Sequence, residues 1–132
     1  MSIPRDEVFS KVREILVCAL AVDEEEVVLG ASLQEDLGAE SIDRLDITFQ
    51  LERAFNIEIR KADSIFDVIE SVFMNPEWVN DITLNKKGLL ELKSRMPYAD
   101  LSVFGRNPTR KTFHSQTLTV GIIVDYLVWR TQ

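Results

Sequence analysis

The chain has 132 residues, of which 45% are hydrophobic and 28% are charged. This composition excludes a disordered chain and indicates one globular domain over residues 1–132. Residues 1–60 carry 14 acidic and 6 basic side chains, whereas residues 61–132 carry 8 and 9, so the net charge of −7 belongs to the first half. An acidic half argues against nucleic-acid binding and favours basic protein partners, with solubility as the alternative explanation.

The single cysteine, the single histidine and the lengths of the apolar runs exclude several classes of protein. The single cysteine, Cys18, allows no intramolecular disulfide and no cysteine metal cluster, which fits a cytoplasmic location. We expect this thiol to be buried as a small hydrophobe. The only histidine, His114, has no second ligand beside it, so no metal site is predicted. The apolar runs are too short to span a membrane, and early charges such as Arg5 predict no signal peptide.

The first predicted helix begins at Ser2 and Pro4 and runs to about Leu20. Its apolar stripe consists of Val8, Val12, Ile15, Leu16 and Ala19. Further along, Ser32 and Glu35 have the spacing of a capping box, which predicts a short turn whose leucines close one end of a helical bundle.

The second predicted helix begins at Ser41 and runs to about Ala54, followed by a short extended tail to Ile59. Its spacing predicts a buried face made of Leu45, Ile47, Leu51 and Phe55. The side chains expected to face water are Asp43, Arg44, Asp46, Gln50 and Glu52. Ser41 falls in the first helical turn, where free N–H groups and the positive end of the helix dipole favour an attached anion. The Ser41 hydroxyl is therefore well placed to carry a phosphodiester.

Three further helical segments are predicted after residue 60. One begins at Asp63 and ends before Asn75, and the next is capped by Thr83 and ends at Pro97. Residues 97–116 lack periodicity but hold too many apolar side chains for a disordered linker, so we expect ordered, irregular structure. The last helix opens at Thr117 or Thr119, and its core stripe is Val120, Ile123, Val124 and Leu127.

Two stretches, residues 31–42 and 51–59, resemble the modification site and following helix of acyl carrier proteins, and residues 119–127 are similar to that family's last helix. The resemblance covers about residues 3–60 and 117–130. It implies an all-α fold, an antiparallel helical bundle of the acyl carrier type. The remaining residues, about 62–116, are an extra helical and irregular insertion.

The resemblance also implies a function. In the family a phosphopantetheinyl transferase attaches 4′-phosphopantetheine from coenzyme A to a serine, which corresponds to Ser41 here. The thiol of that arm then carries acyl groups as thioesters in lipid, fatty acid or secondary-metabolite biosynthesis, so the protein is a carrier and not an enzyme. Acyl-loading and acyl-using enzymes with basic patches dock on the second helix. The docking candidates in this sequence are Asp36, Glu40, Asp43, Asp46 and Glu52. A cytoplasmic monomer without nucleic-acid partners is expected.

Other functions compete with this interpretation. Glu40 stands where the family has Asp, and the insertion is long, which are the features expected of a scaffold protein that has lost modification. An aminoacyl or peptidyl carrier is a close variant. A serine-nucleophile enzyme would need His114 as its base and lacks the Gly-x-Ser-x-Gly turn.

The insertion has a local excess of positive charge between residues 83 and 116. Its basic residues are Lys86, Lys87, Lys93, Arg95, Arg106, Arg110 and Lys111, with His114 beside them. The acidic residues of the same segment are Glu91 and Asp100. This segment is either a specificity element for one enzyme or an acyl chain, or extra scaffold whose charges pair weakly with the acidic half.

Overall fold

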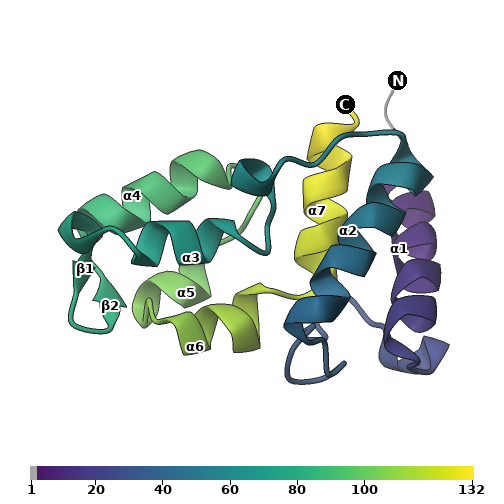
Figure 1. Cartoon of the computed structure of the whole chain (residues 1–132), viewed down its shortest axis with the longest axis horizontal. Coiled ribbons are helices and arrows are strands. Elements are labelled where there is room, and N and C mark those ends of the chain that lie inside the picture. The colour runs from purple at the N-terminus through teal and green to yellow at the C-terminus, as the bar shows by residue number, and fades with distance from the viewer. Residues whose placement is uncertain (1–2) are drawn as a thin grey trace.

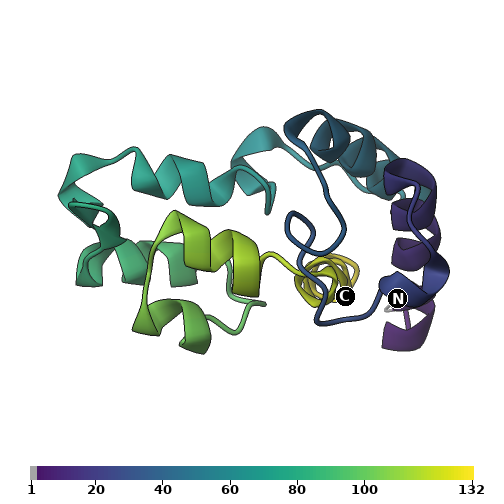
Figure 2. The same ribbon diagram turned by 90° about the horizontal axis from the view of Figure 1, so that it is seen from below.

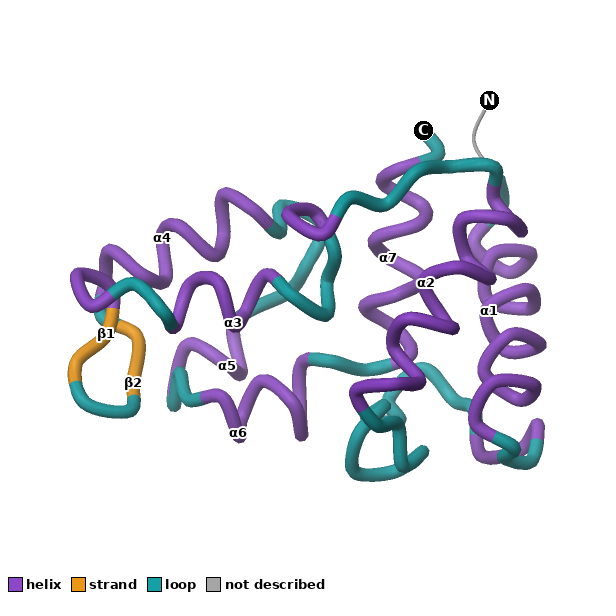
Figure 3. The backbone as a smooth tube through the Cα atoms, in the orientation of Figure 1, coloured by secondary structure: helices purple, strands orange, loops and turns teal. Residues whose placement is uncertain are grey.

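The structure, a computed structural model, describes residues 3–132. The predicted start of the first helix at Ser2 lies outside the described residues. The described chain is mainly helical, and its strands form one short hairpin (Figure 3). The helices are α1 (Arg5–Leu20), α2 (Ser41–Phe55), α3 (Val68–Phe73), α4 (Lys86–Arg95), α5 (Ser102–Arg106), α6 (Arg110–Thr112) and α7 (Val120–Arg130). Strands β1 (Val79–Asn80) and β2 (Thr83–Leu84) pair antiparallel. The all-α fold class is therefore confirmed.

Helices α1, α2 and α7 form a bundle in which α1 packs against both of the others (Figures 1 and 2). Helices α2 and α7 run in one direction and α1 in the opposite one. The predicted apolar stripes meet in the centre, where Val12, Ile47 and Ile123 are fully buried. Residues spaced by three and four share one helix face, which is why these stripes were readable from the sequence.

Helices α3 to α6 and the hairpin form a second group beside the bundle (Figure 1). Two connections join the groups at opposite ends of the bundle: residues 56–67 after α2, and a π-helical segment, Phe113–Thr117, before α7. The rings of Phe104 and Phe113 meet edge to face at 5.7 Å inside this second group. The buried side chains of both groups form one continuous hydrophobic cluster. Residues 62–116 are thus packed structure rather than a loose loop.

Helix α4 lies directly against the backbone of the preceding turn. A Cβ atom at Gly88 would lie 2.5 Å from the Trp78 carbonyl oxygen, so only glycine fits this close approach. The helix is capped by Asn85, whose side-chain oxygen accepts the Gly88 N–H at 3.0 Å. The predicted cap, Thr83, is wrong, because that residue pairs in β2 and donates its hydroxyl to the Asn80 carbonyl at 3.0 Å.

Two further expectations were wrong. The helix predicted from Asp63 begins only at Val68, because the Ser64 hydroxyl accepts the Phe66 N–H at 3.2 Å and holds a turn that competes with helix. Cys18 is exposed rather than buried, since α1 directs it away from the bundle.

Candidate functional site

The loop before α2 is fixed to the beginning of the last helix. The Leu33 N–H donates to the Leu118 carbonyl at 3.1 Å, and the Val120 N–H donates to the Ala31 carbonyl at 3.0 Å. Between them, the buried Ser32 hydroxyl donates to the His114 carbonyl at 2.7 Å. These bonds join residues far apart in the sequence, so the segment that presents Ser41 has a rigid base.

The predicted capping box at Ser32 forms only in part. The Glu35 N–H donates to the Ser32 hydroxyl at 3.1 Å, but the carboxylate that returns to the Ser32 N–H, at 2.7 Å, belongs to Asp36. Turns rather than a helix follow. The two leucines of this loop, Leu33 and Leu37, are buried, as expected for residues that close one end of the bundle.

Gly38 directs the chain from this loop into α2. Its φ of 70° lies in the left-handed region, which is strained for residues with a Cβ atom. The next residue, Ala39, is buried and donates its N–H to the Leu33 carbonyl at 2.8 Å. The chain then emerges at the surface at Glu40 and Ser41.

Ser41 is the first residue of α2 and its side chain is exposed. The carboxylate of Asp43 accepts the Glu40 N–H at 2.8 Å and so stabilises the helix start. The N–H groups of Asp43 and Arg44 donate to the Glu40 carbonyl, whereas among the described residues those of Ser41 and Ile42 have no acceptor. The start of the helix therefore keeps two N–H donors for an anion attached there. Within residues 3–132 no side-chain hydrogen bond engages the Ser41 hydroxyl. The hydroxyl is free to react but has no base of its own.

The five predicted docking residues do not share one role. Glu40 and Asp46 are exposed on the surface of the first turns of α2. Asp36 and Asp43 are engaged by backbone N–H groups of the loop and the helix start. Glu52 lies farther along and accepts the Ile59 N–H at 2.7 Å, which fixes the tail after α2. Three of these carboxylates therefore also have structural functions.

A row of exposed apolar side chains on α2 was missed by the sequence analysis. Ile42, Leu45 and Phe49 are 76%, 65% and 59% exposed, whereas Ile47 and Leu51 are buried. The predicted burial of Leu45 is wrong, because α2 has two apolar rows on opposite faces and Leu45 belongs to the outer one. The spacing of three and four in this row was the available signal. Exposed rows of this kind mark interaction surfaces.

A hollow of about 440 Å³ opens beside Ser41 between α2 and the connection to α3. Helix α2 contributes Ser41, Arg44, Leu45 and Thr48, and the facing wall contributes Ile59, Lys61, Ser64, Phe66 and Asp67. Two basic residues and one acidic residue thus line a partly apolar space. Arg44, predicted to face water, is instead half-buried on this wall.

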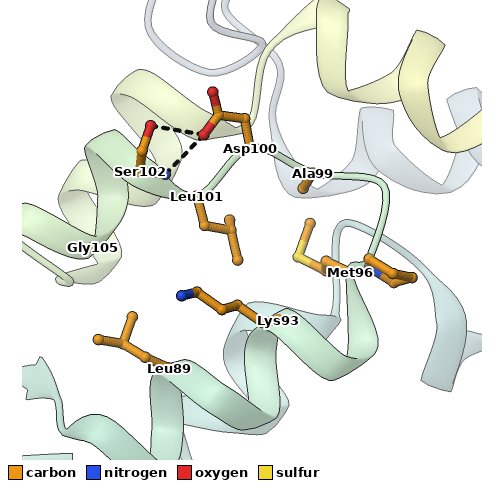
Figure 4. A pocket seen from close by; sticks show the side chains of 9 residues that line it. Leu89, Lys93, Met96, Ala99, Asp100, Leu101, Ser102 and Gly105 are labelled. Carbon is orange, nitrogen blue, oxygen red and sulfur yellow. Dashed lines mark hydrogen bonds between the residues drawn. The ribbon is translucent and has the colours of Figure 1, made fainter.

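Three other hollows lie away from Ser41, and one of them, of about 420 Å³, is lined by residues of α1 and by Glu24. The remaining two involve residues after α2. One, of about 590 Å³, lies between α4 and α5 in the insertion, where Lys93 and Met96 extend toward Leu101 (Figure 4). The Asp100 carboxylate at its rim accepts hydrogen bonds from the N–H and hydroxyl of Ser102. The other, of about 930 Å³, lies between bundle and insertion and includes residues of both.

Two arginines of residues 83–116 pair with acidic residues that also lie after α2. Arg95 contacts Glu91 at 2.9 Å, and Arg110 contacts Glu70 at 3.1 Å. Among residues 3–132, no ion pair joins these basic side chains to the acidic first 60 residues.

His114 is the remaining candidate for chemistry near the site. Its side chain is 14% exposed, its Nε2 lies 4.0 Å from the Glu70 carboxylate, and its Nδ1 is buried without a partner. Burial lowers the pKa of His114, and the Arg44 guanidinium lowers it further. Within residues 3–132, no group of three or more His, Cys, Asp or Glu side chains is arranged for a metal ion. In the same range, no helix is both long and apolar enough to cross a bilayer.

Comparison with known proteins identifies the family. Residues 10–68 match the family described as "Phosphopantetheine attachment site". The acyl carrier protein of Petrotoga mobilis is 47% identical over 59 residues, which are 45% of this chain and 69% of that protein. The acyl carrier protein of Rubrobacter xylanophilus is 43% identical over 70 residues, 52% of this chain and 86% of that protein. The acyl carrier protein of Thermotoga maritima is 42% identical over 59 residues, which are 45% of this chain and 73% of that protein. The chain therefore belongs to the acyl carrier protein family, whose prosthetic group is 4′-phosphopantetheine.

Proposed function

We propose that Ser41 is the residue that receives 4′-phosphopantetheine, and that the arm carries acyl intermediates of lipid or secondary-metabolite biosynthesis. The observation that carries the proposal is an exposed, unengaged hydroxyl at the first residue of α2, at the mouth of a hollow. The match over residues 10–68 includes this serine. The rigid loop on Leu118 and Val120 holds the helix start in a constant position for an incoming enzyme.

The attachment step places different tasks on the two proteins. The Ser41 oxygen would attack the phosphorus of coenzyme A that bears pantetheine, and its proton would pass to a base of the transferase. The bond from this phosphorus to the bridging oxygen of the diphosphate would break, and adenosine 3′,5′-bisphosphate would leave. The free N–H groups of the first turn of α2 stabilise the phosphodiester that results. Once attached, the arm supplies a thiol for thioester chemistry, and the protein supplies position and shelter.

The same site gives little support for catalysis by the chain itself. A serine nucleophile needs a base within hydrogen-bond reach. The one histidine lies beside Glu70 instead, and its lowered pKa follows mainly from burial. We therefore propose a carrier whose chemistry is performed by partner enzymes.

We propose that these partners, the transferase and the acyl-loading and acyl-using enzymes, dock on the outer face of α2. Glu40 and Asp46 supply exposed negative charge to meet basic patches, and complementary charge mainly speeds and orients encounter. The apolar row Ile42, Leu45 and Phe49 supplies the area that is buried in the complex. Because coenzyme A and the transferase must reach Ser41, we place the protein in the cytoplasm.

Intact-protein mass spectrometry tests the proposal. The protein is incubated with coenzyme A and a broad-specificity phosphopantetheinyl transferase, with Ser41→Ala as a parallel sample. The proposal expects a gain of one phosphopantetheine that is absent from the variant. A second incubation, of the modified protein with candidate acyl-loading or aminoacyl-loading enzymes and their substrates, identifies the cargo class. No gain with several transferases would contradict the proposal and favour a scaffold without the arm.

A further inference from the structure

The hollow beside Ser41 has a charge pattern that the carrier function alone does not explain. Its lining residues include two basic ones, Arg44 and Lys61, and one acidic one, Asp67. The surrounding half of the protein is strongly acidic, with 14 acidic and 6 basic side chains in residues 1–60. The hollow thus differs in charge from the acidic half of the protein around it, and this difference needs a separate explanation.

Neither Arg44 nor Lys61 forms a close ion pair among the described residues. Among residues 3–132, no carboxylate lies within 4.0 Å of the charged groups of Arg44 or Lys61. The one side-chain contact of the Arg44 guanidinium is to the Gln34 amide oxygen, at 3.5 Å. A guanidinium carries five N–H donors, and a half-buried one is stabilised by an anion that accepts them.

An arm attached to Ser41 would place an anion beside this hollow. The Ser41 side chain itself lines the hollow, and the phosphorus of an attached arm is bonded directly to its oxygen. Arg44 is one helical turn after Ser41, and residues three apart are neighbours on the helix surface. The carboxylates of Glu40 and Asp43, which would repel a phosphate, do not line the hollow, and Asp43 is held by the Glu40 N–H.

We propose that Arg44 and Lys61 hold the phosphodiester of the arm at the mouth of this hollow, so that the arm lies between α2 and the connection to α3. This inference rests on the proposed attachment to Ser41. The arm then contacts the apolar residues that line the hollow, which are Leu45, Ile59 and Phe66. The connection between α2 and α3 thereby controls how far the arm projects into solvent. Both cations act as positioning residues.

Phosphorus NMR of the holo-protein tests the proposal. Intact mass is measured first, so that the attachment itself is established in every sample. The samples are the unchanged protein, Arg44→Gln, Lys61→Gln and, as a matched control, Arg53→Gln, an exposed arginine near the end of α2 that does not line the hollow. Circular dichroism verifies folding, and because Lys61 is exposed, its variant keeps the test valid if Arg44→Gln folds poorly.

The expected result is a phosphodiester resonance that moves toward the position of a free arm in both hollow variants and stays unchanged in Arg53→Gln. Each lost cation lowers the ratio of docked to free arm by about two- to fivefold, the range for partly exposed ion pairs. In the unchanged protein, raising salt from about 0.01 M to about 1 M produces the same movement, because the screening length falls from roughly 30 Å to roughly 3 Å. The amide resonances of Thr48 and Phe66, which line the hollow, respond in parallel.

The outcomes separate this inference from the proposed function. A mass gain in all samples with one common phosphorus resonance, insensitive to salt, would overturn the docked arm and leave the carrier function intact. No mass gain in any sample would overturn both. Equal movement in Arg53→Gln and the hollow variants would also overturn the inference, because it would reveal a general effect of protein charge.

Discussion

Two leucines on opposite faces of α2 give a sharp test of the site. Leu51 is 2% exposed in the bundle core, whereas Leu45 is 65% exposed in the outer apolar row. Truncating a buried leucine removes its transfer free energy and leaves a cavity, so Leu51→Ala lowers the free energy of unfolding by about 3 kcal/mol. Only about a third of Leu45 is covered, so Leu45→Ala lowers it by about 1 kcal/mol or less. Urea unfolding followed by circular dichroism measures both values.

The effects of the two substitutions on phosphopantetheine transfer are expected in the reverse order: Leu45→Ala has the larger effect and Leu51→Ala the smaller. If Leu45 is buried by partner enzymes, its truncation lowers kcat/KM for phosphopantetheine transfer by about tenfold, equivalent to about 1.4 kcal/mol of lost contact. Leu51→Ala, assayed well below its unfolding midpoint, retains the original kcat/KM. The reasoning is refuted if Leu45→Ala destabilises the protein as much as Leu51→Ala, which would place Leu45 in the core. Unchanged transfer and unchanged acyl loading in Leu45→Ala would instead refute the docking face.

Two further predictions concern the insertion. Gly88→Ala lowers the free energy of unfolding by about 1–3 kcal/mol, because its Cβ atom would overlap the Trp78 carbonyl. Gly105→Ala in α5 has open space around the new Cβ atom, so it is neutral or raises the free energy of unfolding by up to about 1 kcal/mol. Thermal unfolding measures whether each variant is less or more stable than the unchanged protein. His114→Gln reduces the stability lost between about pH 7 and pH 5. The reason is that the folded-state pKa of His114 is lowered below its ordinary value, so its stabilising contribution is present above that value and lost on acidification. An identical pH profile in the variant would contradict this.

The sequence predicted those features of the fold that are determined by residues close together in the chain. The stripes of α1 and α7 follow helical spacing, and their members Val12 and Ile123 are fully buried. Ser41 was placed at a helix start by the residues around it, and α2 does begin there. The inner face of α2 was predicted correctly at Leu51 but not at Leu45, because either of two apolar rows satisfies the same spacing.

The parts that were not predicted depend on contacts between distant residues. Residues 97–117 form short helices whose stability comes from packing, as in the contact of Phe104 with Phe113, and segments this short are not stable as isolated helices. The turn at Ser32 stays non-helical because its neighbour Leu33 pairs with Leu118. The positive hollow was invisible in the sequence, because Lys61 reaches it from the opposite wall.

The most direct test of the central claim is the location of the arm within the modified protein. Cleavage after Arg13 and Arg44 yields one peptide, 14–44, that contains two serines, Ser32 and Ser41, and no threonine. Ser32 is 1% exposed and its hydroxyl is engaged by the His114 carbonyl, so it serves as an internal control. Fragmentation of this peptide by tandem mass spectrometry is predicted to place the entire phosphopantetheine mass on Ser41. A fully modified protein whose Ser41 carries no added mass would contradict the account.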